Sequence, residues 1–174
     1  MNWRELLQSE IKVNYNVADQ LFDWISDKDL AWKPAGGSNW MTVGQLLMHI
    51  AVGTGPAFKA VITGDWGLPE GKDPSEMSEE EMLPPAAKMP AVETVDQAKQ
   101  LLQKDMQETL DYLSRATDER LENEPAPVPW DPTGISLGYR LLQFVIHLNQ
   151  HKGQLFYYLK LQEKPVNTQH LWGM

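Results

Sequence analysis

The sequence predicts an all-α fold, a four-helix bundle, and three observations lead to this prediction. Apolar residues recur at steps of three and four in four separate stretches, as they do along one face of a helix. Two of these stretches open with a Thr-x-x-Gln pattern that is typical of a helix start. Nearly all of the prolines lie between the stretches. The chain of 174 residues suits one domain, so we expect residues 1–174 to form one domain with an insertion or flap at about 63–93.

The first two helices are expected in the N-terminal third of the chain. The first should lie near residues 3–26 and end before the turn-rich sequence KPAGGSN. The second should begin at Thr42, where Thr42 and Gln45 can form a capping box, and continue to about Ile62. Both stretches carry one apolar face, which indicates that both helices contribute to a shared core.

The other two helices are expected after a long connection. The third should start at Thr94, with Gln97 completing its cap, and continue to about Arg115. The fourth should cover residues 136–161, with an apolar seam formed by Leu137, Leu141, Phe144, Leu148, His151, Leu155 and Leu159.

The connections are long and rich in residues that break helices. Residues 63–93 contain three glycines and five prolines, and we expect 64–92 to be a mobile flap because they offer little apolar area for packing. Residues 117–135 include EPAPVPWDPTG, which predicts an extended segment. Long crossovers are compatible with a bundle whose neighbouring helices are not consecutive.

Charge argues against a nucleic-acid partner. Fifteen basic and 24 acidic residues give a net charge of −9, the wrong sign for a phosphate-binding surface. Between Asp65 and Glu93 there are eight acids and two lysines, two-thirds of the net charge. A solvated loop is the simplest interpretation of that cluster.

The sequence also indicates a protein that does not bind membranes. From the sequence alone, we expect no apolar run that approaches the roughly 20 residues needed to cross a bilayer. The first ten residues, MNWRELLQSE, have neither the basic nor the apolar part of a signal peptide. We therefore expect a cytoplasmic protein.

Missing motifs exclude several kinds of catalysis. The chain has no cysteine, so it offers no disulfide, no thiolate ligand and no cysteine nucleophile. It has no G-x-S-x-G turn, no phosphate-binding glycine loop and no HExxH sequence. If the protein is an enzyme, a bound metal must supply most of the chemistry.

Three of the four histidines have a spacing that could close around one metal ion. His147 and His151 are four residues apart, which places both on the same side of the fourth helix. His49 lies in the apolar stretch VGQLLMHIAV of the second helix. Imidazole is a ligand for zinc, nickel, cobalt and copper, and three protein ligands leave one position open. The alternative is that each histidine is a hydrogen-bonded core residue.

Four polar residues could orient these imidazoles. Asn14 and Asp105 interrupt apolar stripes of the first and third helices, although a solvent-facing position is the simpler interpretation of both. Gln45 and Gln143 each lie one turn before a candidate ligand and are weaker candidates for the same role.

Aromatic residues in the expected loops have two interpretations. Trp40, Trp66 and Trp130 could anchor loops to the core, or could line the mouth of a pocket. His170, in the tail NTQHLWGM, has no candidate partner and is expected to be a surface or docking residue.

Two sequence strings carry a resemblance to a known family. The segment WMTVGQLLMHIA, which contains His49, and the string HLNQHKGQL at 147–155 resemble the metal-binding helices of the DinB/YfiT-like superfamily. The second string fits that family's motif H-x3-H-(R/K)-GQL. The resemblance implies an up-down-down-up four-helix bundle in which His49, His147 and His151 hold one divalent metal, with zinc or nickel favoured.

The resemblance implies two classes of function. Some related families are thiol S-transferases, in which the metal lowers the pKa of a thiol such as bacillithiol or mycothiol for attack on a small electrophilic substrate. A metal-dependent hydrolase is a variant that lacks an obvious general base. The other class is a stress-associated module that binds a metal or small molecule without turnover. Metal binding should weaken as the pH falls through about 6.5, the ordinary histidine range.

Related bundles often form homodimers. Exposed apolar side chains at Phe156, Tyr157 and Tyr158 would suit such a contact.

Overall fold

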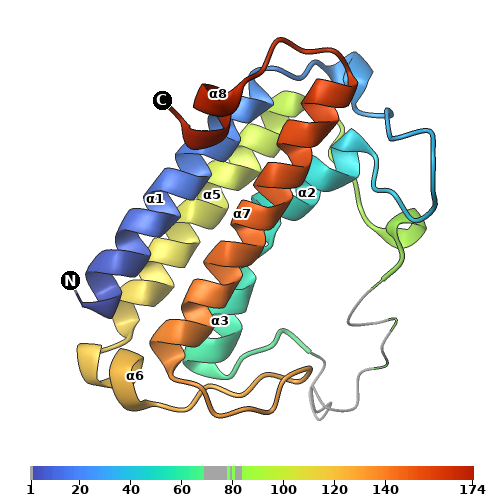
Figure 1. Ribbon diagram of the computed structural model, residues 1–174. Helices are drawn as coiled ribbons and strands as arrows, with labels where there is room; N and C mark the ends of the chain where they lie inside the picture. The colour runs from blue at the N-terminus through green and yellow to red at the C-terminus, as the bar shows by residue number, and fades with distance from the viewer. Residues whose placement is uncertain (1, 69–77, 79, 81–83) are drawn as a thin grey trace.

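The computed structural model describes residues 2–68, 78, 80 and 84–174. In this part of the chain the long helices lie side by side as a bundle (Figure 1): α1 (Trp3–Phe22), α2 (Val43–Val52), α3 (Thr54–Thr63), α5 (Val95–Arg115) and α7 (Leu137–Leu161). Helix α1 packs against α5 and α7, and α2 and α3 pack against the same two helices. Figure 1 shows α1 and α7 running in one direction along the bundle, and α2, α3 and α5 in the other. The prediction of an all-α bundle is confirmed.

Two helices start at the predicted caps. Thr42 Oγ1 accepts the backbone N–H of Gln45, whose side-chain oxygen accepts the N–H of Thr42 in return. Thr94 Oγ1 accepts the N–H of Gln97 in the same way at the start of α5. These bonds satisfy N–H groups that the first turn of a helix leaves without partners.

Helix α1 is shorter than expected. It ends at Phe22, because Ser26 begins a separate 3₁₀ helix, η1 (Asp27–Asp29). The carboxylate of Asp29 accepts both the backbone N–H and the hydroxyl of Ser26, which holds the chain in a new direction.

The second predicted helix is two helices, α2 and α3, separated at Gly53. Pro56 lies in the first turn of α3, where its missing N–H costs nothing, whereas inside a continuous helix it would remove a hydrogen bond. The N–H groups of Thr54 and Gly55 donate to the carboxylate of Asp105 in α5, at 3.3 and 3.0 Å. A side chain from a neighbouring helix therefore caps α3 and stabilises the break.

The connection before α7 contains a helix that we did not expect. Thr117 Oγ1 accepts the N–H of Arg120 and caps α6 (Asp118–Asn123), whose acidic first turn suits a helix N-terminus. The extended chain begins only at Glu124, after which isolated antiparallel bridges hold it together.

The expected flap is only partly described. Residues 69–77, 79 and 81–83 of that segment lie outside the described residues. Further on, the short 3₁₀ helix η3 (Ala86–Lys88) and Val92 pack against the start of α2, with Ala86 and Val92 buried. The N–H of Val92 donates to the carbonyl of Gly44 at 3.1 Å. The end of the segment is therefore packed against the bundle, because it supplies apolar side chains and backbone partners that we had overlooked.

The C-terminal segment docks on α1 through α8 (Thr168–Trp172). The His170 ring lies edge-on to Trp24, with ring centroids 5.1 Å apart. Its Nδ1 accepts the backbone N–H of Asn167 at 3.0 Å. His170 is therefore a docking residue, one of the two roles expected for it.

The apolar surface proposed for a homodimer is not where we expected it. Phe156 and Tyr158 are buried at 3% and 2% exposure, whereas Tyr157 is 64% exposed. Successive residues of a helix point about 100° apart, so three neighbours cannot share one face. The expectation of a joint exposed face is wrong for two of its three members.

One stretch, Val43–Thr63, is long and apolar enough to cross a membrane when judged by length and composition alone. We did not expect any run of this kind. Half of the apolar window is buried inside the bundle, as in a core helix of a soluble protein, which passes the same test. The finding is therefore weak evidence for a membrane span.

Candidate metal centre

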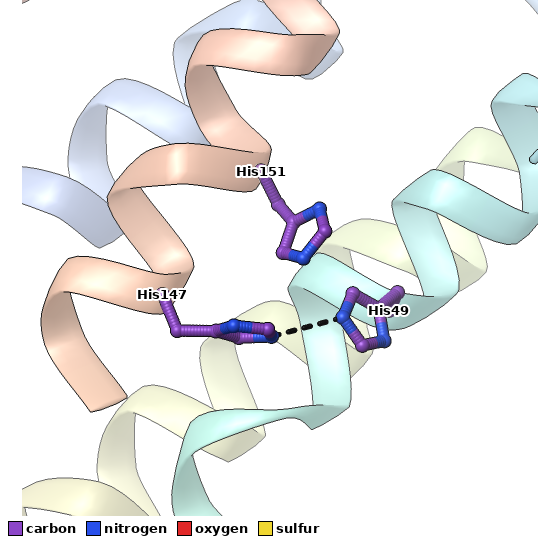
Figure 2. A group of neighbouring side chains, drawn as sticks. All are labelled: His49, His147 and His151. Carbon is purple, nitrogen blue, oxygen red and sulfur yellow. Dashed lines mark hydrogen bonds between the residues drawn. The ribbon is translucent and has the colours of Figure 1, made fainter. Parts of the chain in front are cut away.

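Three histidine side chains face one another between α2 and α7 (Figure 2). His49 lies in the last turn of α2, and the four-residue spacing of His147 and His151 directs both toward it from α7. His49 Nε2 and His147 Nε2 are 3.0 Å apart. One nitrogen from each ring lies within 4.8 Å of the other two. The fold thus brings together all three histidines that the sequence singled out.

The donor set and its spacing fit a transition metal. A tetrahedral zinc ion with Zn–N bonds of about 2.0–2.1 Å separates its ligand nitrogens by about 3.3 Å. The Nε2 atoms of His49 and His147 already lie close to that separation at 3.0 Å, and the three ligand nitrogens lie within 4.8 Å of one another. Within the described residues no carboxylate belongs to the group, so the site offers imidazole nitrogen alone.

Burial keeps these imidazoles neutral. Desolvation, and then the proximity of His151 and His147, lower the pKa of His49 to about 4. Desolvation, followed by the proximity of His151, lowers the pKa of His147 to about 4. The pKa of His151 is also lowered by burial, against a hydrogen bond that acts in the opposite direction. All three are therefore in the form that binds metals at neutral pH.

A chain of hydrogen bonds orients His151. Because Gln154 Oε1 can only accept, the 2.9 Å contact requires His151 Nδ1 to carry the proton. Gln154 Nε2 donates to the hydroxyl of Tyr158 at 3.3 Å, and that hydroxyl donates to the carbonyl of Met41 at 3.1 Å. This arrangement leaves the lone pair on His151 Nε2, free to bind a metal.

A cavity of about 520 Å³ opens beside the histidines. His49 and His147 form part of its wall, so a ligand in the cavity would lie next to an open metal position. The rest of the lining is mainly apolar and consists of Gly53, Ala57, Trp130, Arg140, Gln143 and Phe144.

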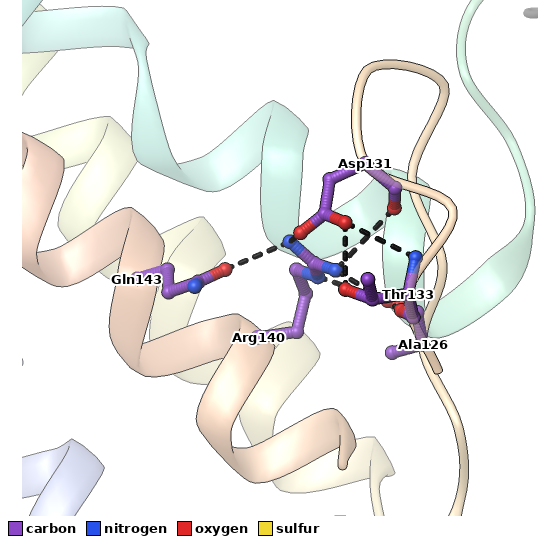
Figure 3. A network of polar contacts seen from close by, with 5 residues as sticks. All are labelled: Ala126, Asp131, Thr133, Arg140 and Gln143. Carbon is purple, nitrogen blue, oxygen red and sulfur yellow. Dashed lines mark hydrogen bonds and ion pairs between the residues drawn. The ribbon is translucent and has the colours of Figure 1, made fainter. Parts of the chain in front are cut away.

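Arg140 is the cation of that lining, and it is bound on all sides by protein groups (Figure 3). Its Nε donates to the carbonyl of Ala126 at 2.9 Å. Its Nη1 donates to Asp131 Oδ2 at 2.9 Å and to Gln143 Oε1 at 2.8 Å. Its Nη2 donates to the carbonyls of Asp131 and Thr133 at 3.4 and 3.3 Å. Arg140 thereby fastens the loop before α7 to the start of that helix.

Asn14 and Asp105 neither orient a ligand imidazole nor face solvent, which were the two positions expected for them. They are 5% and 4% exposed, so neither faces solvent. Asn14 accepts a hydrogen bond from Lys152 Nζ at 3.2 Å, and Asp105 accepts one from the hydroxyl of Tyr15 at 2.5 Å. Neither contacts a candidate ligand among the described hydrogen bonds. Burial raises the pKa of Asp105 to about 6, against the hydrogen bonds that lower it.

The two glutamines expected to orient ligands bind other groups. Gln45 Nε2 donates to the carbonyls of Ala86 and Met89 at 2.6 and 2.9 Å, which fastens that segment to α2. Gln143 bonds Arg140 and lines the cavity instead of contacting an imidazole.

The pocket interpretation of the tryptophans is correct for part of the set. Trp130 lines the cavity, and Trp66 meets it edge-on with ring centroids 5.8 Å apart. Trp40 lines a separate cavity of about 350 Å³ and lies near Tyr158, with its Nε1 donating to the carbonyl of Gly36.

Gln154 and Arg140 were overlooked in the sequence. Gln154 is the glutamine of the HKGQL string, and its position three residues after His151 places the two side chains on one face of the helix. That spacing could have identified it. Arg140 carried no comparable signal, because its partners come from the preceding loop.

Comparisons with known proteins agree with this architecture. A family model described as the DinB superfamily matches residues 10–155, which include all three histidines. The crystal structure of a DinB-like protein, YjoA, from Bacillus subtilis is similar, with a TM-score of 0.62 over 91% of this chain and 92% of that chain. The two are 19% identical, so this likeness concerns the fold. No curated protein matches the sequence. The extent of the family match shows that this chain belongs to the DinB superfamily.

Proposed function

We propose that the protein binds one divalent transition metal, zinc or nickel, through His49, His147 and His151. The observation that carries the proposal is the convergence of three imidazoles from two helices, with their nitrogens within 4.8 Å of one another. Three protein ligands leave one coordination position open, and the neighbouring cavity gives a small molecule access to it.

The residues around the histidines prepare them for this role. Burial lowers their pKa values, so a metal does not have to displace protons at neutral pH. Gln154 holds the His151 ring in the tautomer that directs Nε2 toward the other two rings. Phe144 and Trp130 give the cavity beside the site apolar walls.

We further propose that the protein transfers a low-molecular-weight thiol to a small electrophile. A divalent metal supplies the Lewis acidity that lowers the pKa of a thiol at its open position. The cavity can hold the electrophile next to that position. In the transfer, the sulfur forms a bond to the electrophilic carbon, one existing bond of that carbon breaks, and the atom that takes the electron pair of that bond receives a proton in place of the one lost by the thiol.

The lining of the cavity favours this reaction over hydrolysis. Its lining, as far as the described residues form it, contains no aspartate or glutamate that could act as general base toward water. The same lack of an acid or base beyond the histidines supports a second candidate, a module that binds the metal and a small molecule without turnover.

Two measurements test the proposal. The first is elemental analysis of protein purified without a histidine tag, which should find about one zinc or nickel per chain. The second is conjugation of glutathione, bacillithiol, mycothiol or coenzyme A to a model electrophile, with a cobalt-substituted sample to report thiol binding by its visible spectrum.

One thiol should perturb the cobalt spectrum and support turnover above the uncatalysed rate, and His151→Ala should abolish both effects. A spectral change without turnover would favour the binding module. If no thiol changes the spectrum or the rate, the thiol proposal is wrong.

A further inference from the structure

The single cation in the described lining of the cavity is not available to a ligand. Arg140 is 2% exposed, and each of its five N–H groups has a protein acceptor within 3.4 Å. The carboxylate of Asp131 accepts from its Nη1 and balances its charge. An anionic ligand would have to break this network to reach the guanidinium.

Gln143 presents to the cavity a hydrogen-bond donor that no described acceptor occupies. Its Oε1 accepts from Arg140, and Figure 3 shows its amide nitrogen turned away from that contact. Because Arg140 can only donate, it fixes the orientation of the amide. No acceptor in the described part of the chain bonds Gln143 Nε2. The result is an oriented N–H₂ group at a cavity wall, one turn of α7 before His147.

The other walls favour an apolar molecule. Ala57, Phe144 and Trp130 offer apolar surface, and the Trp66 ring meets the Trp130 ring edge-on. The net charge of −9 further disfavours the approach of anions. The apolar walls and the net negative charge of the protein therefore both favour an uncharged molecule in the cavity.

We propose that the cavity takes an uncharged molecule with an apolar body and a carbonyl-type oxygen that accepts a hydrogen bond from Gln143 Nε2. This inference rests on the proposed function, because it names the class of electrophile that would lie beside the metal. Gln143 is then a residue that determines specificity, and Arg140 orients it.

A pair of probes of similar shape tests the proposal in the metal-free protein at pH 7.5. One is N,N-dimethyl-4-phenylbutanamide, which is neutral and can only accept hydrogen bonds. The other is 4-phenylbutanoate, which is anionic. The metal is removed with a chelator because it would attract the carboxylate directly. Isothermal titration calorimetry should find that the amide binds roughly tenfold more tightly or better, since a charge without a partner is costly to bury.

Two substitutions of Gln143 separate the effect of its N–H donor from the effect of its contact with Arg140. Gln143→Met removes the donor at similar volume, and Gln143→Glu removes it while keeping an acceptor for Arg140. Each should weaken amide binding about threefold to tenfold, the range of one neutral hydrogen bond. The matched control, Gln150→Met, changes an exposed glutamine of the same helix outside the cavity lining and should have no effect.

The proposal is overturned if the carboxylate binds as tightly as the amide, if neither probe binds, or if both Gln143 variants keep the wild-type affinity. Failure of the metal proposal would appear separately, as an absence of zinc binding by the wild-type protein. The probe titrations use metal-free protein and do not depend on that result.

Discussion

At the scale of single residues, Gln154 holds the His151 ring in the tautomer that leaves Nε2 free. Gln154→Met removes the acceptor and keeps a side chain of similar length. Because residues that orient a ligand imidazole typically contribute 10–100-fold to affinity, zinc binding should weaken by about that factor. Competition with a chromogenic chelator measures the change. Gln150→Met is the control, and equal zinc affinities of the two variants would show that Gln154 does not orient the ligand.

The lowered histidine pKa values make the metal-free protein sensitive to acid. In the unfolded chain these imidazoles take up protons near pH 6.5, whereas folded His49 and His147 stay neutral down to about pH 4. The unfolded state then binds more protons, so this contribution to stability is complete above pH 6.5 and is lost as the pH falls toward 4. The drop in Tm between pH 7 and pH 4.5 should be smaller in His49→Gln than in the wild type. Drops of equal size would contradict the lowered pKa.

The same pKa values change an expectation made from the sequence. An ordinary imidazole would lose its metal as the pH falls through about 6.5. In the folded protein, protons compete with the metal at His49 and His147 only as the pH approaches 4, and burial lowers the pKa of His151 as well. Zinc affinity should therefore decline only slightly between pH 7 and pH 5.5, as chelator competition can measure. A tenfold loss of zinc affinity for each pH unit in that range would instead show that the ligand histidines keep their ordinary pKa of about 6.5.

At the scale of elements, the break between α2 and α3 depends on Asp105. Asp105→Ala would leave the N–H groups of Thr54 and Gly55 without their acceptor, whereas the hydroxyl of Tyr15 keeps Thr109 Oγ1 as a partner. Each buried donor left unpaired costs about 1–3 kcal/mol, so the free energy of unfolding should fall by at least about 2 kcal/mol. Asp105→Asn keeps an oxygen acceptor and should lose less in urea denaturation. If the two variants are equally stable, the carboxyl contacts do not hold the start of α3.

At the scale of the whole molecule, metal binding should stabilise the fold. A metal that binds only the folded chain adds about 2.7 kcal/mol at a hundredfold excess over its Kd. With roughly 2–4 °C per kcal/mol for a domain of this size, zinc should raise Tm by about 5–11 °C. Thermal denaturation of chelator-treated protein with and without zinc measures this shift.

Two histidine variants identify the source of that shift. His151→Ala removes a proposed ligand and should erase the effect of zinc. His170→Ala removes the contact between α8 and Trp24, so it can lower the starting Tm but should keep the rise on adding zinc. A shift that survives in His151→Ala, or disappears in His170→Ala, would mean that other residues bind the metal.

Local pattern was enough to predict the four helical stretches of the bundle, though not every break within and between them, and the shared face of His147 and His151. The caps at Thr42 and Thr94 depend on contacts three residues apart, which a sequence displays directly. The four-residue spacing of His147 and His151 likewise sets both on one side of a helix before any tertiary contact forms. The family resemblance favoured an up-down-down-up arrangement, which periodicity alone could not choose, and strengthened the case for His49 as the third ligand.

The tertiary structure decided everything that depends on partners far away in the chain. Asn14 and Asp105 are buried because they bond Lys152 and Tyr15 on other helices. The pattern of apolar stripes within one helix does not contain these partners, so it indicated surface positions. Arg140 looks like an ordinary helix residue until the preceding loop folds over it. The cavity and the lowered pKa values of the histidines arise only when packing removes water from the space between α2 and α7. Sequence period reports which side of a helix is buried, but charge, protonation and shape at a site depend on what is buried beside it.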